Sequence, residues 1–275
     1  MIAGTRTGVK ANAAYVAERR VDHNGPVPGP AEFDWREFPP DLLSEAKGDR
    51  RVSVCLPAWN EEATVGAIVA AVCGLGGLVD EVLVVDDGST DATARRAEEA
   101  GARVVRGGPP GEPGGKGGAV ATAVAAAEGD VLVFCDADLR ECDAAFVTGL
   151  LGPLLVYESL DFVKGWFDRP GEGGRVTELT ARPLVRLLHP DLLAFTQPLA
   201  GEFAARRPLL EKVRLEPGYG VDLGLLLDAF RLVGPERMAQ VYLGRRVHRN
   251  RPLSELGEEA LAVARVALAR AGITR

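Results

Sequence analysis

The chain has 275 residues, of which 47% are hydrophobic and 26% are charged, and its formal net charge is −7. This composition is that of an ordinary globular protein, and the negative charge argues against a general nucleic-acid or anionic-membrane binder. The sequence has no charge-free run of about 18 apolar residues, the length that spans a bilayer, and the N-terminus lacks the apolar core of a signal peptide. We therefore expect a cytoplasmic protein.

The first 49 residues are expected to be irregular. Proline and glycine interrupt the stretch 24–30, Pro39-Pro40 interrupts it again, and only 41–47 has the pattern of a short helix. We expect this arm either to be partly disordered or to wrap around the domain.

From residue 51 the pattern becomes regular. Predicted strands cover 51–56, 81–85, 103–105 and 131–135, and predicted helices cover 62–72, 91–99 and 116–128. Strands that alternate with helices of this length indicate an α/β fold with a mostly parallel sheet flanked by helices. We therefore expect residues 50–140 to form a nucleotide-binding half.

The strand at 131–135 ends on two carboxylates, Asp136 and Asp138, separated by one residue. Ligands of open α/β sheets bind outside the carboxyl ends of the strands, and two acids this close repel each other unless a cation is near. Hard oxygen ligands suit Mg²⁺ or Mn²⁺. The pair therefore predicts a metal-and-diphosphate site, although an Asp turn and a helix cap would explain it equally well in isolation.

Two other strand ends carry polar side chains. The first is followed by Pro57-Ala-Trp-Asn-Glu61 rather than a Gly-x-Gly-x-x-Gly turn, which disfavours a dinucleotide site. Trp59 offers a flat ring to a base. The second ends in Asp86-Asp87-Gly-Ser, where Asp87 could accept from a base N–H or the segment could simply be a capped turn.

Lys116 lies in a glycine-rich loop at the start of a predicted helix. The loop is not a Walker P-loop, because Pro110 replaces its first glycine and Gly117 its Ser/Thr. A lysine at a helix start can still bind phosphate, since backbone donors and the helix dipole favour an anion there. The alternative is a solvated lysine.

The second half has a more mixed pattern. Predicted strands cover 161–167 and 240–248, and predicted helices cover 175–188, 221–232 and 254–271. We expect residues 141–252 to form an acceptor-binding half and 253–275 a C-terminal helix. The four cysteines, Cys55, Cys73, Cys135 and Cys142, have neither CxxC nor zinc spacing, and we expect reduced core residues.

The order of the motifs L-P-x-x-N-E-E, V-V-D-D-G-S-T-D, G-K-G and D-A-D resembles nucleotide-sugar glycosyltransferases of the GT-A fold. In the second half, the segments 173–183, 197–202, 217–224 and 248–252 are similar to glucosyl-3-phosphoglycerate synthases of actinobacteria and their mannosyl relatives. The resemblance covers about residues 50–272 and leaves the first 49 uncovered.

The resemblance implies a role for particular residues on the donor side. Asp138 and His248 would ligate a divalent metal, either Mg²⁺ or one of Mn²⁺ and Co²⁺. An imidazole ligand suits Mn²⁺ and Co²⁺ better than Mg²⁺. His248 could otherwise be a plain strand-end histidine. The nucleoside, ribose and phosphates would be contacted by Pro57, Ala58, Trp59, Glu61, Asp87, Lys116, Asp136 and Ala137.

It also implies an acceptor site for 3-phosphoglycerate. Arg175, Thr177, Asn250 and the Gly174 backbone would bind the acceptor, whose phosphate and carboxylate call for a guanidinium fork, a hydroxyl and backbone N–H groups. Asp222 would bind hydroxyls of the transferred sugar. Glucosyl members carry Glu there and mycobacterial members carry a small polar residue at the position of Asp87, so GDP-mannose stays open as a donor.

The implied reaction moves a hexosyl group from an NDP-sugar, with UDP-glucose favoured, to the 2-hydroxyl of 3-phospho-D-glycerate. The resemblance implies retention, whereas a general base at Asp222 would imply inversion. It also implies a homodimer formed through the terminal helix and the strand before it.

Two other functions stay in view. An inverting transferase to a polyprenyl phosphate would need a membrane-seeking segment, which the acidic terminal helix (Glu255, Glu258, Glu259) does not supply. A nucleotide-sugar sensor would have lost its metal or acceptor ligands, which this sequence retains.

Overall fold

The computed structural model describes residues 29–108, 111, 114–139, 144–169, 174–246 and 256–273. Within them, one sheet has the strand order β1-β8-β6-β7-β5-β2-β3-β4. Its strands are β1 (Ala31–Asp34), β2 (Val52–Ala58), β3 (Glu81–Asp86), β4 (Arg103–Arg106), β5 (Val131–Phe134), β6 (Phe162–Asp168), β7 (Phe203–Arg206) and β8 (Met238–Arg245). Only β7 runs antiparallel to its neighbours, β5 and β6. The expected mostly parallel α/β sheet is confirmed.

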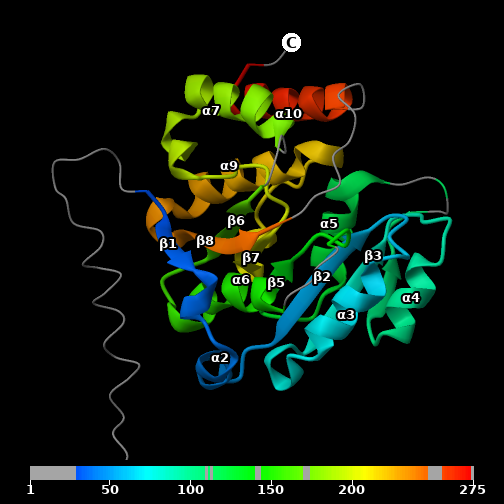
Figure 1. Ribbon diagram of the computed structural model, residues 1–275. Helices are drawn as coiled ribbons and strands as arrows, with labels where there is room; N and C mark the ends of the chain where they lie inside the picture. The colour runs from blue at the N-terminus through cyan, green and yellow to red at the C-terminus, as the bar shows by residue number, and fades with distance from the viewer. Residues whose placement is uncertain are drawn as a thin grey trace, which may run out of the picture.

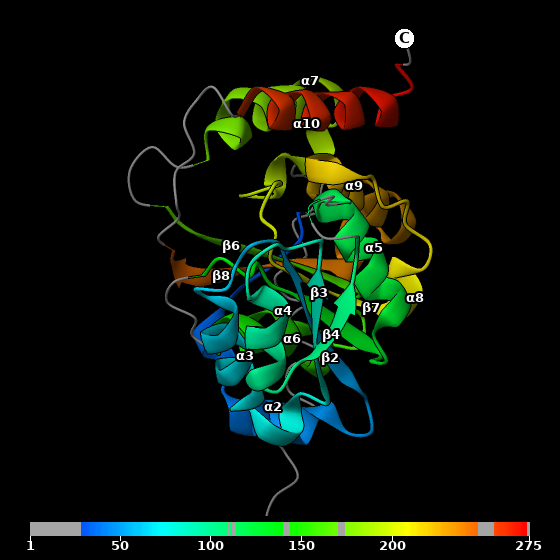
Figure 2. The same cartoon turned by 90° about the vertical axis from the view of Figure 1, so that its right-hand side faces the viewer.

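Helices cover both faces of this sheet (Figure 1). They are α2 (Pro40–Lys47), α3 (Val65–Cys73), α4 (Thr93–Glu99), α5 (Gly115–Ala126), α6 (Ala145–Val156), α7 (Arg182–Leu188), α8 (Arg207–Leu210), α9 (Val221–Val233) and α10 (Leu256–Arg270). One core lies between the sheet and α2, α3, α4 and α6, and the other lies between the sheet and α5, α8 and α9. Helices α7 and α10 lie side by side as an outer layer over α9 (Figure 2).

The apolar strands place alternate side chains in the two cores. In β2, Val54 and Leu56 belong to the core beneath α3, whereas Cys55 belongs to the core beneath α5. A strand covered on both faces is apolar throughout, because each face of the pleat meets a helix. This explains why β2, β3 and β5 could be predicted from their continuous apolar runs.

Helix α6 was not predicted. Its residues from Phe146 to Leu155 are all buried, with Pro153 inside the helix. A helix that is apolar all round has no amphipathic period, so the pattern that identified the other helices is missing here. Gly149 and Gly152 face Trp35 and Phe38 so closely that a Cβ at either position would clash.

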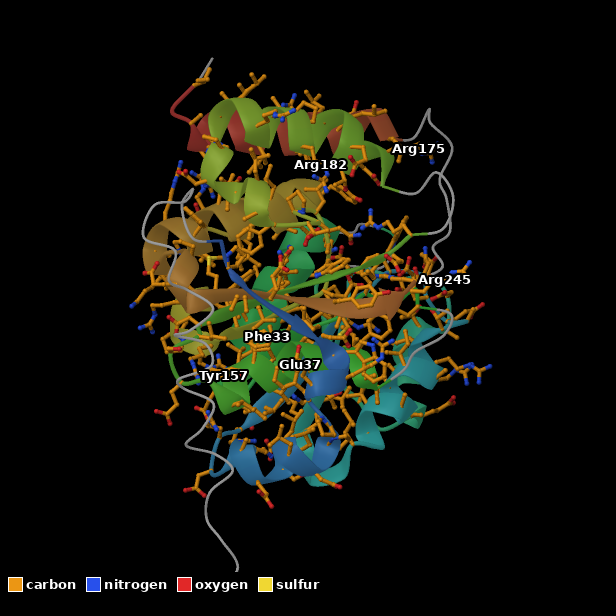
Figure 3. The ribbon with its side chains drawn as sticks, turned by 60° about the vertical axis from the view of Figure 1, so that its left-hand side comes forward. Phe33, Glu37, Tyr157, Arg175, Arg182 and Arg245 are labelled. Atoms are coloured by element: carbon orange, nitrogen blue, oxygen red, sulfur yellow. The ribbon has the colours of Figure 1, made fainter. Side chains whose placement is uncertain are left out.

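The two short strands β1 and β7 were also missed, and β1 corrects the expectation of an irregular arm. It pairs with β8 at the sheet edge, and the Phe33 ring stacks on Tyr157, with 5.3 Å between the centroids. Figure 3 shows both rings on this side of the molecule. The arm therefore wraps the domain from residue 31 onward, and the predicted helix at 41–47 is confirmed.

Some predicted boundaries move. The helix expected at 62–72 begins at Val65. The helix expected at 175–188 is confirmed as one continuous helical stretch, in which a π-helical segment (Thr177–Ala181) precedes α7. Cys55 and Cys135 are buried as expected, but Cys73 is exposed because it ends α3, while Cys142 lies outside the described residues. No disulfide joins the three cysteines that the structure describes. No helix within the described ranges is long and apolar enough to cross a membrane. The division near residue 140 stays a prediction.

Candidate active site

Three strand ends meet at one edge of the sheet. Ala58 at the end of β2 pairs in register with Asp86 at the end of β3, and the Asp87 N–H donates to the Ala58 carbonyl at 2.9 Å. Strand β5 lies on the other side of β2 and leads into Asp136. The carboxyl ends of parallel neighbours share an edge, so the polar residues after them converge.

Asn60 joins two of these loops. Its backbone takes φ = +57°, a left-handed conformation that asparagine tolerates better than most residues. Its N–H donates to the Ser89 hydroxyl and its side-chain oxygen accepts from the Thr90 N–H, both at 2.9 Å. The turn leaves Trp59 with 49% of its surface exposed, at the wall of the pocket.

The adjacent acids Asp86 and Asp87 do different things. Asp86 accepts from the Ser89 N–H at 3.1 Å and closes the turn that the sequence offered as one alternative. Asp87 accepts from the Gly114 and Gly115 N–H groups at 2.9 and 2.8 Å, one with each carboxylate oxygen. The Asp87 carboxylate is thus the anion at the N-terminus of α5, and its two hydrogen bonds fix the loop that carries Lys116. Its nucleoside role stays a prediction.

Lys116 stands between two carboxylates. Its ammonium lies 3.1 Å from Asp136 Oδ1 and 3.1 Å from Asp222 Oδ2. Burial acts to lower the pKa of Lys116, but the charges of Asp136 and Asp222 outweigh it and raise the pKa above its usual value. Burial raises the pKa of Asp222. Gly201 packs so close to Lys116 and Asp136 that a side chain there would clash with both.

Arg246 is the second cation of the site and is almost fully buried. Its Nη2 lies 3.1 Å from Asp136 and 3.0 Å from Asp138, and its Nη1 forms an ion pair with the buried Glu202. The guanidinium carbon lies 5.0 Å from the centre of the Phe167 ring. Burial acts to raise the pKa of Asp136, but Lys116 and Arg246 outweigh it and hold that pKa below its usual value.

A third buried cation lies in β6. Lys164 is 1% exposed, and within the described ranges its ammonium has no hydrogen-bond partner; the Phe203 ring centre lies 5.9 Å away. Burial lowers the pKa of Lys164 to about 8, which the charge of Asp222 partly opposes. A buried ammonium without a partner is costly to the fold.

The strand ends, α5 and the segment before α7 enclose a pocket of about 520 Å³. The predicted residues in its wall are Pro57, Ala58, Trp59, Glu61, Asp87, Lys116, Asp136, Ala137, Asp138, Gly174, Arg175 and Thr177. Asp222 is not in the wall, and it reaches the site through its bond to Lys116. His248 and Asn250 lie outside the described residues. The structure thus gathers most of the predicted residues that it describes, while the role of each residue stays a prediction.

The predicted acceptor residues begin a helical segment above the sheet. Gly174 accepts from the Glu178 N–H at 2.9 Å, and Thr177 is buried at the start of the π turn. Figure 3 shows Arg175 at the edge of this segment, on the same side of the molecule as Arg245 at the end of β8. Of these two arginines only Arg175 lines the pocket, where it joins Arg169 from the end of β6.

The donor set fits a hard divalent ion. Asp138 lines the pocket with 45% of its side chain exposed, and one of its oxygens bonds Arg246. Among the described residues no group of three or more potential ligands is assembled, and His248 lies outside them. Asp138 can therefore supply one carboxylate oxygen to Mg²⁺ or Mn²⁺, which commonly takes one or two from protein and the rest from phosphates.

Several pocket residues had no role in the sequence analysis: Phe167, Arg169, Glu202, Tyr219 and Arg246. Glu202 ends the segment 197–202 and Tyr219 lies within 217–224, so the resemblance marked their neighbourhood without marking the residues. For Arg246 the available signal was its place two residues before His248. No local pattern indicates that a buried glutamate will pair with an arginine from a distant strand.

The family model for glycosyl transferase family 2 matches residues 53–208. This match covers strands β2 to β7 and the strand ends that form the pocket. The chain is therefore a glycosyltransferase with the GT-A arrangement that its sequence indicated.

Relatives and solved structures narrow the family. The glucosyl-3-phosphoglycerate synthase of Mycolicibacterium smegmatis is 48% identical over 247 residues, covering 84% of this chain and 81% of that protein. The one from Petrotoga mobilis is 39% identical, covering 82% and 74%. The Mycobacterium tuberculosis enzyme in complex with Mn²⁺, UDP-glucose and phosphoglyceric acid superimposes with a TM-score of 0.84 at 46% identity, covering 91% and 90% of the two chains. The chain belongs to the glucosyl-3-phosphoglycerate synthase family.

Proposed function

We propose that this protein transfers the glucosyl group of UDP-glucose to the 2-hydroxyl of 3-phospho-D-glycerate, releasing UDP and glucosyl-3-phosphoglycerate. One observation carries the proposal: a single pocket holds the donor-side cluster at three strand ends and the basic acceptor segment facing it. The M. tuberculosis relative has been crystallised with UDP and glucosyl-3-phosphoglycerate, which supports the same product here.

UDP-glucose is the donor that the family supports, and the structure weakens one argument for GDP-mannose. That argument rested on Asp87 accepting from two guanine N–H groups. Asp87 already accepts from the Gly114 and Gly115 N–H groups, one with each oxygen. An aspartate at position 87, where mycobacterial members carry a small polar residue, is then explained by these two hydrogen bonds to the start of α5. A different donor base is not needed to explain it.

The donor side neutralises charge on the leaving diphosphate. Asp138, and His248 as the resemblance implies, would hold a divalent ion, which would supply Lewis-acid stabilisation to that diphosphate. Lys116 brings a cation whose raised pKa keeps it protonated at neutral pH. Arg246 holds Asp136 and Asp138 in place, so the charged groups need little rearrangement as the sugar–phosphate bond breaks.

The acceptor side orients 3-phosphoglycerate toward the same sugar carbon. Arg175, Thr177 and the Gly174 backbone, with Asn250, bind its anionic groups, and positioning of this kind is worth several kcal/mol of the barrier. We propose retention: the bond from C1 to the 2-hydroxyl oxygen forms on the face from which the diphosphate leaves. The hydroxyl proton passes to the departing phosphate oxygen, so no protein base is required.

Asp222 fits a binding role better than a general-base role. Its carboxylate is 2% exposed and bonds Lys116 at 3.1 Å, an arrangement suited to accepting from sugar hydroxyls beside the diphosphate. A base that drives inversion would lie across the sugar from the leaving group, whereas Asp222 shares Lys116 with the diphosphate side.

We also propose a cytoplasmic homodimer. The free thiols of Cys55, Cys73 and Cys135 support a reducing compartment. Exposed leucines on the outer layer formed by α7, α10 and the π turn, namely Leu179, Leu187 and Leu261, support an interface there. Light scattering on the wild type and on Leu187→Asp tests it: the wild type should be dimeric and the variant should shift toward monomer.

An assay of UDP release with Mg²⁺ or Mn²⁺ tests the reaction. We expect release from UDP-glucose that depends on 3-phosphoglycerate, little release of GDP from GDP-mannose, and loss of turnover in Asp138→Ala. Turnover without the acceptor, or equal turnover with a polyprenyl phosphate, would overturn the assignment. Binding of UDP-glucose without any turnover would favour the sensor.

A further inference from the structure

Arg169, directly after β6, is a cation that the proposed mechanism does not use. It lines the pocket, and within the described part of the chain it forms no ion pair and its Nε is buried without a hydrogen-bond partner. Three acidic side chains are close enough for their charges to act on it, Tyr219, Asp136 and Glu178. Burial raises the pKa of Tyr219 to about 12, so this group is neutral near pH 7. Asp136 is held by two other cations, and Glu178 pairs with Arg182 at 2.9 Å. Among the described residues, the charge of Arg169 therefore has no partner of its own.

Its surroundings make that charge costly. Burial lowers the pKa of Arg169, and the charge of Arg246 acts in the same direction. The guanidinium groups of Arg169 and Arg246 both pack on the Phe167 ring, and their Cζ atoms lie 4.9 and 5.0 Å, respectively, from the ring centre. The ring holds the Arg169 guanidinium in place but cannot balance its charge as a carboxylate or phosphate would. A desolvated cation held in a pocket wall is an arrangement that favours an anionic ligand.

The position of Arg169 indicates which ligand. Gly174 has φ = +77°, and a Cβ built on it would lie 2.7 Å from Arg169 Nη1. The guanidinium therefore lies against the backbone that begins the segment of Arg175 and Thr177. The donor diphosphate, by contrast, belongs at the strand ends with Lys116.

We propose that Arg169 is a further acceptor-binding residue, whose guanidinium binds an oxyanion of 3-phosphoglycerate. The proposal rests on the proposed function for the identity of the acceptor. It adds a second cation beside Arg175, so that the phosphate and the carboxylate of the acceptor each find a basic partner. Gly174 is then required because any side chain at that position would displace the guanidinium.

Steady-state kinetics of Arg169→Met and Arg169→Lys test the proposal, with Arg182→Met as a neighbouring arginine outside the pocket wall. Acceptor-dependent turnover by the wild type is measured first, so failure of the proposed function is seen separately. We expect Arg169→Met to raise KM for 3-phosphoglycerate about 10- to 100-fold, because a charge-assisted bond is lost. KM for UDP-glucose should stay within about twofold, Arg169→Lys should recover part of the loss, and Arg182→Met should resemble wild type.

Competition with glycerol 3-phosphate and with D-glycerate shows which oxyanion is bound. Weaker inhibition of Arg169→Met by glycerol 3-phosphate alone assigns the phosphate, and weaker inhibition by D-glycerate alone assigns the carboxylate. An equal rise in both substrate KM values would overturn the proposal in favour of a donor or structural role, and unchanged KM values would overturn it outright. If Arg169→Met does not fold, the same split in KM is required of Arg169→Lys.

Discussion

The two walls of the pocket differ in how their charges are balanced. On the donor wall, Lys116 and Arg246 are tied to Asp136, Asp138 and their neighbours by contacts of about 3 Å. On the acceptor wall, Arg169 is held by an aromatic ring and a glycine backbone, without an ion pair among the described residues. One wall is a balanced network, whereas the other holds, within the described ranges, an arginine without an ion pair.

This difference suggests that the two walls have different functions. The donor wall is preorganised for charge that develops during the reaction, which is the arrangement that most favours catalysis. If the other wall binds the acceptor anion as proposed, its charges contribute mainly to affinity and orientation. Substitutions on the donor wall should therefore affect folding and rate together, and those on the acceptor wall should affect KM.

Arg246→Met should have the largest effect on stability. The change leaves Glu202 buried and unpaired, which typically costs about 3–5 kcal/mol. Denaturant unfolding measures the cost. Adding Glu202→Leu to the same chain should restore part of it, because an apolar pair replaces the broken ion pair. A loss below about 1 kcal/mol in the single variant would show that the donor wall is not the balanced network described above.

Lys164→Met should remove a pH dependence. The Lys164 ammonium loses its proton near pH 8 when folded, against its ordinary pKa of 10.5. Between these values the unfolded chain binds more protons, so the wild type should gain stability over the variant as pH rises, by about 3 kcal/mol in total.

Lys47→Met is the matched control for this experiment. Lys47 is also buried, but its ammonium lies 2.7 Å from both Asp80 and the Gly77 carbonyl. We expect its loss to cost about 1–3 kcal/mol near neutral pH, because two acceptors lose their partner. Unfolding curves at pH 7.5, 9 and 10 measure both variants. A difference between wild type and Lys164→Met that is flat with pH would refute the first prediction.

Asp87→Ala should have a smaller effect that is seen in both stability and donor binding. Two N–H groups at the start of α5 lose their acceptor, at a cost of about 1–2 kcal/mol. The loosened loop carries Lys116, so KM for UDP-glucose should rise while KM for 3-phosphoglycerate changes little. Asp87→Asn keeps one acceptor oxygen, so its stability and its KM for UDP-glucose should lie between those of the wild type and Asp87→Ala. Thermal melting and kinetics on all three proteins decide the order.

Arg51→Met should cause the smallest loss of stability among these variants. Arg51 pairs with Glu128 at 2.9 Å, but both side chains are more than half exposed. Such pairs contribute less than about 1 kcal/mol, and neither KM should change. The same denaturant titration gives the baseline for the buried pairs, and a larger cost here would mean that exposed ion pairs in this chain resemble buried ones.

Both walls contain residues that the sequence could predict and residues that it could not. Donor residues such as Asp87, Lys116 and Asp136 directly follow buried strands or begin a helix, so local patterns place them at one sheet edge. Arg169 and Arg246 meet over Phe167 only because β6 and β8 are neighbours in the sheet. Such contacts depend on strand order, which no local pattern contains.

The same reasoning applies to the fold. Periodicity identified the amphipathic helices and the apolar runs identified β2, β3 and β5. Helix α6 was missed because it is buried on every side. Strands β1 (AEFD) and β7 (FAAR) were missed because neither has the β-branched apolar run that marks β5 (VLVF). The motifs indicated the chemistry, whereas tertiary packing decided the partners.

The most direct test of the central claim is the structure of the product. The wild-type enzyme, UDP-glucose and 3-phosphoglycerate are incubated with Mn²⁺, and the product is examined by NMR. We expect one glucosyl group linked through the 2-hydroxyl of the glycerate, with the α configuration of the donor retained and UDP formed in equal amount. A β-linked product would contradict retention at the shared face. Attachment at another atom, or free glucose alone, would contradict the placement of the acceptor opposite the strand ends.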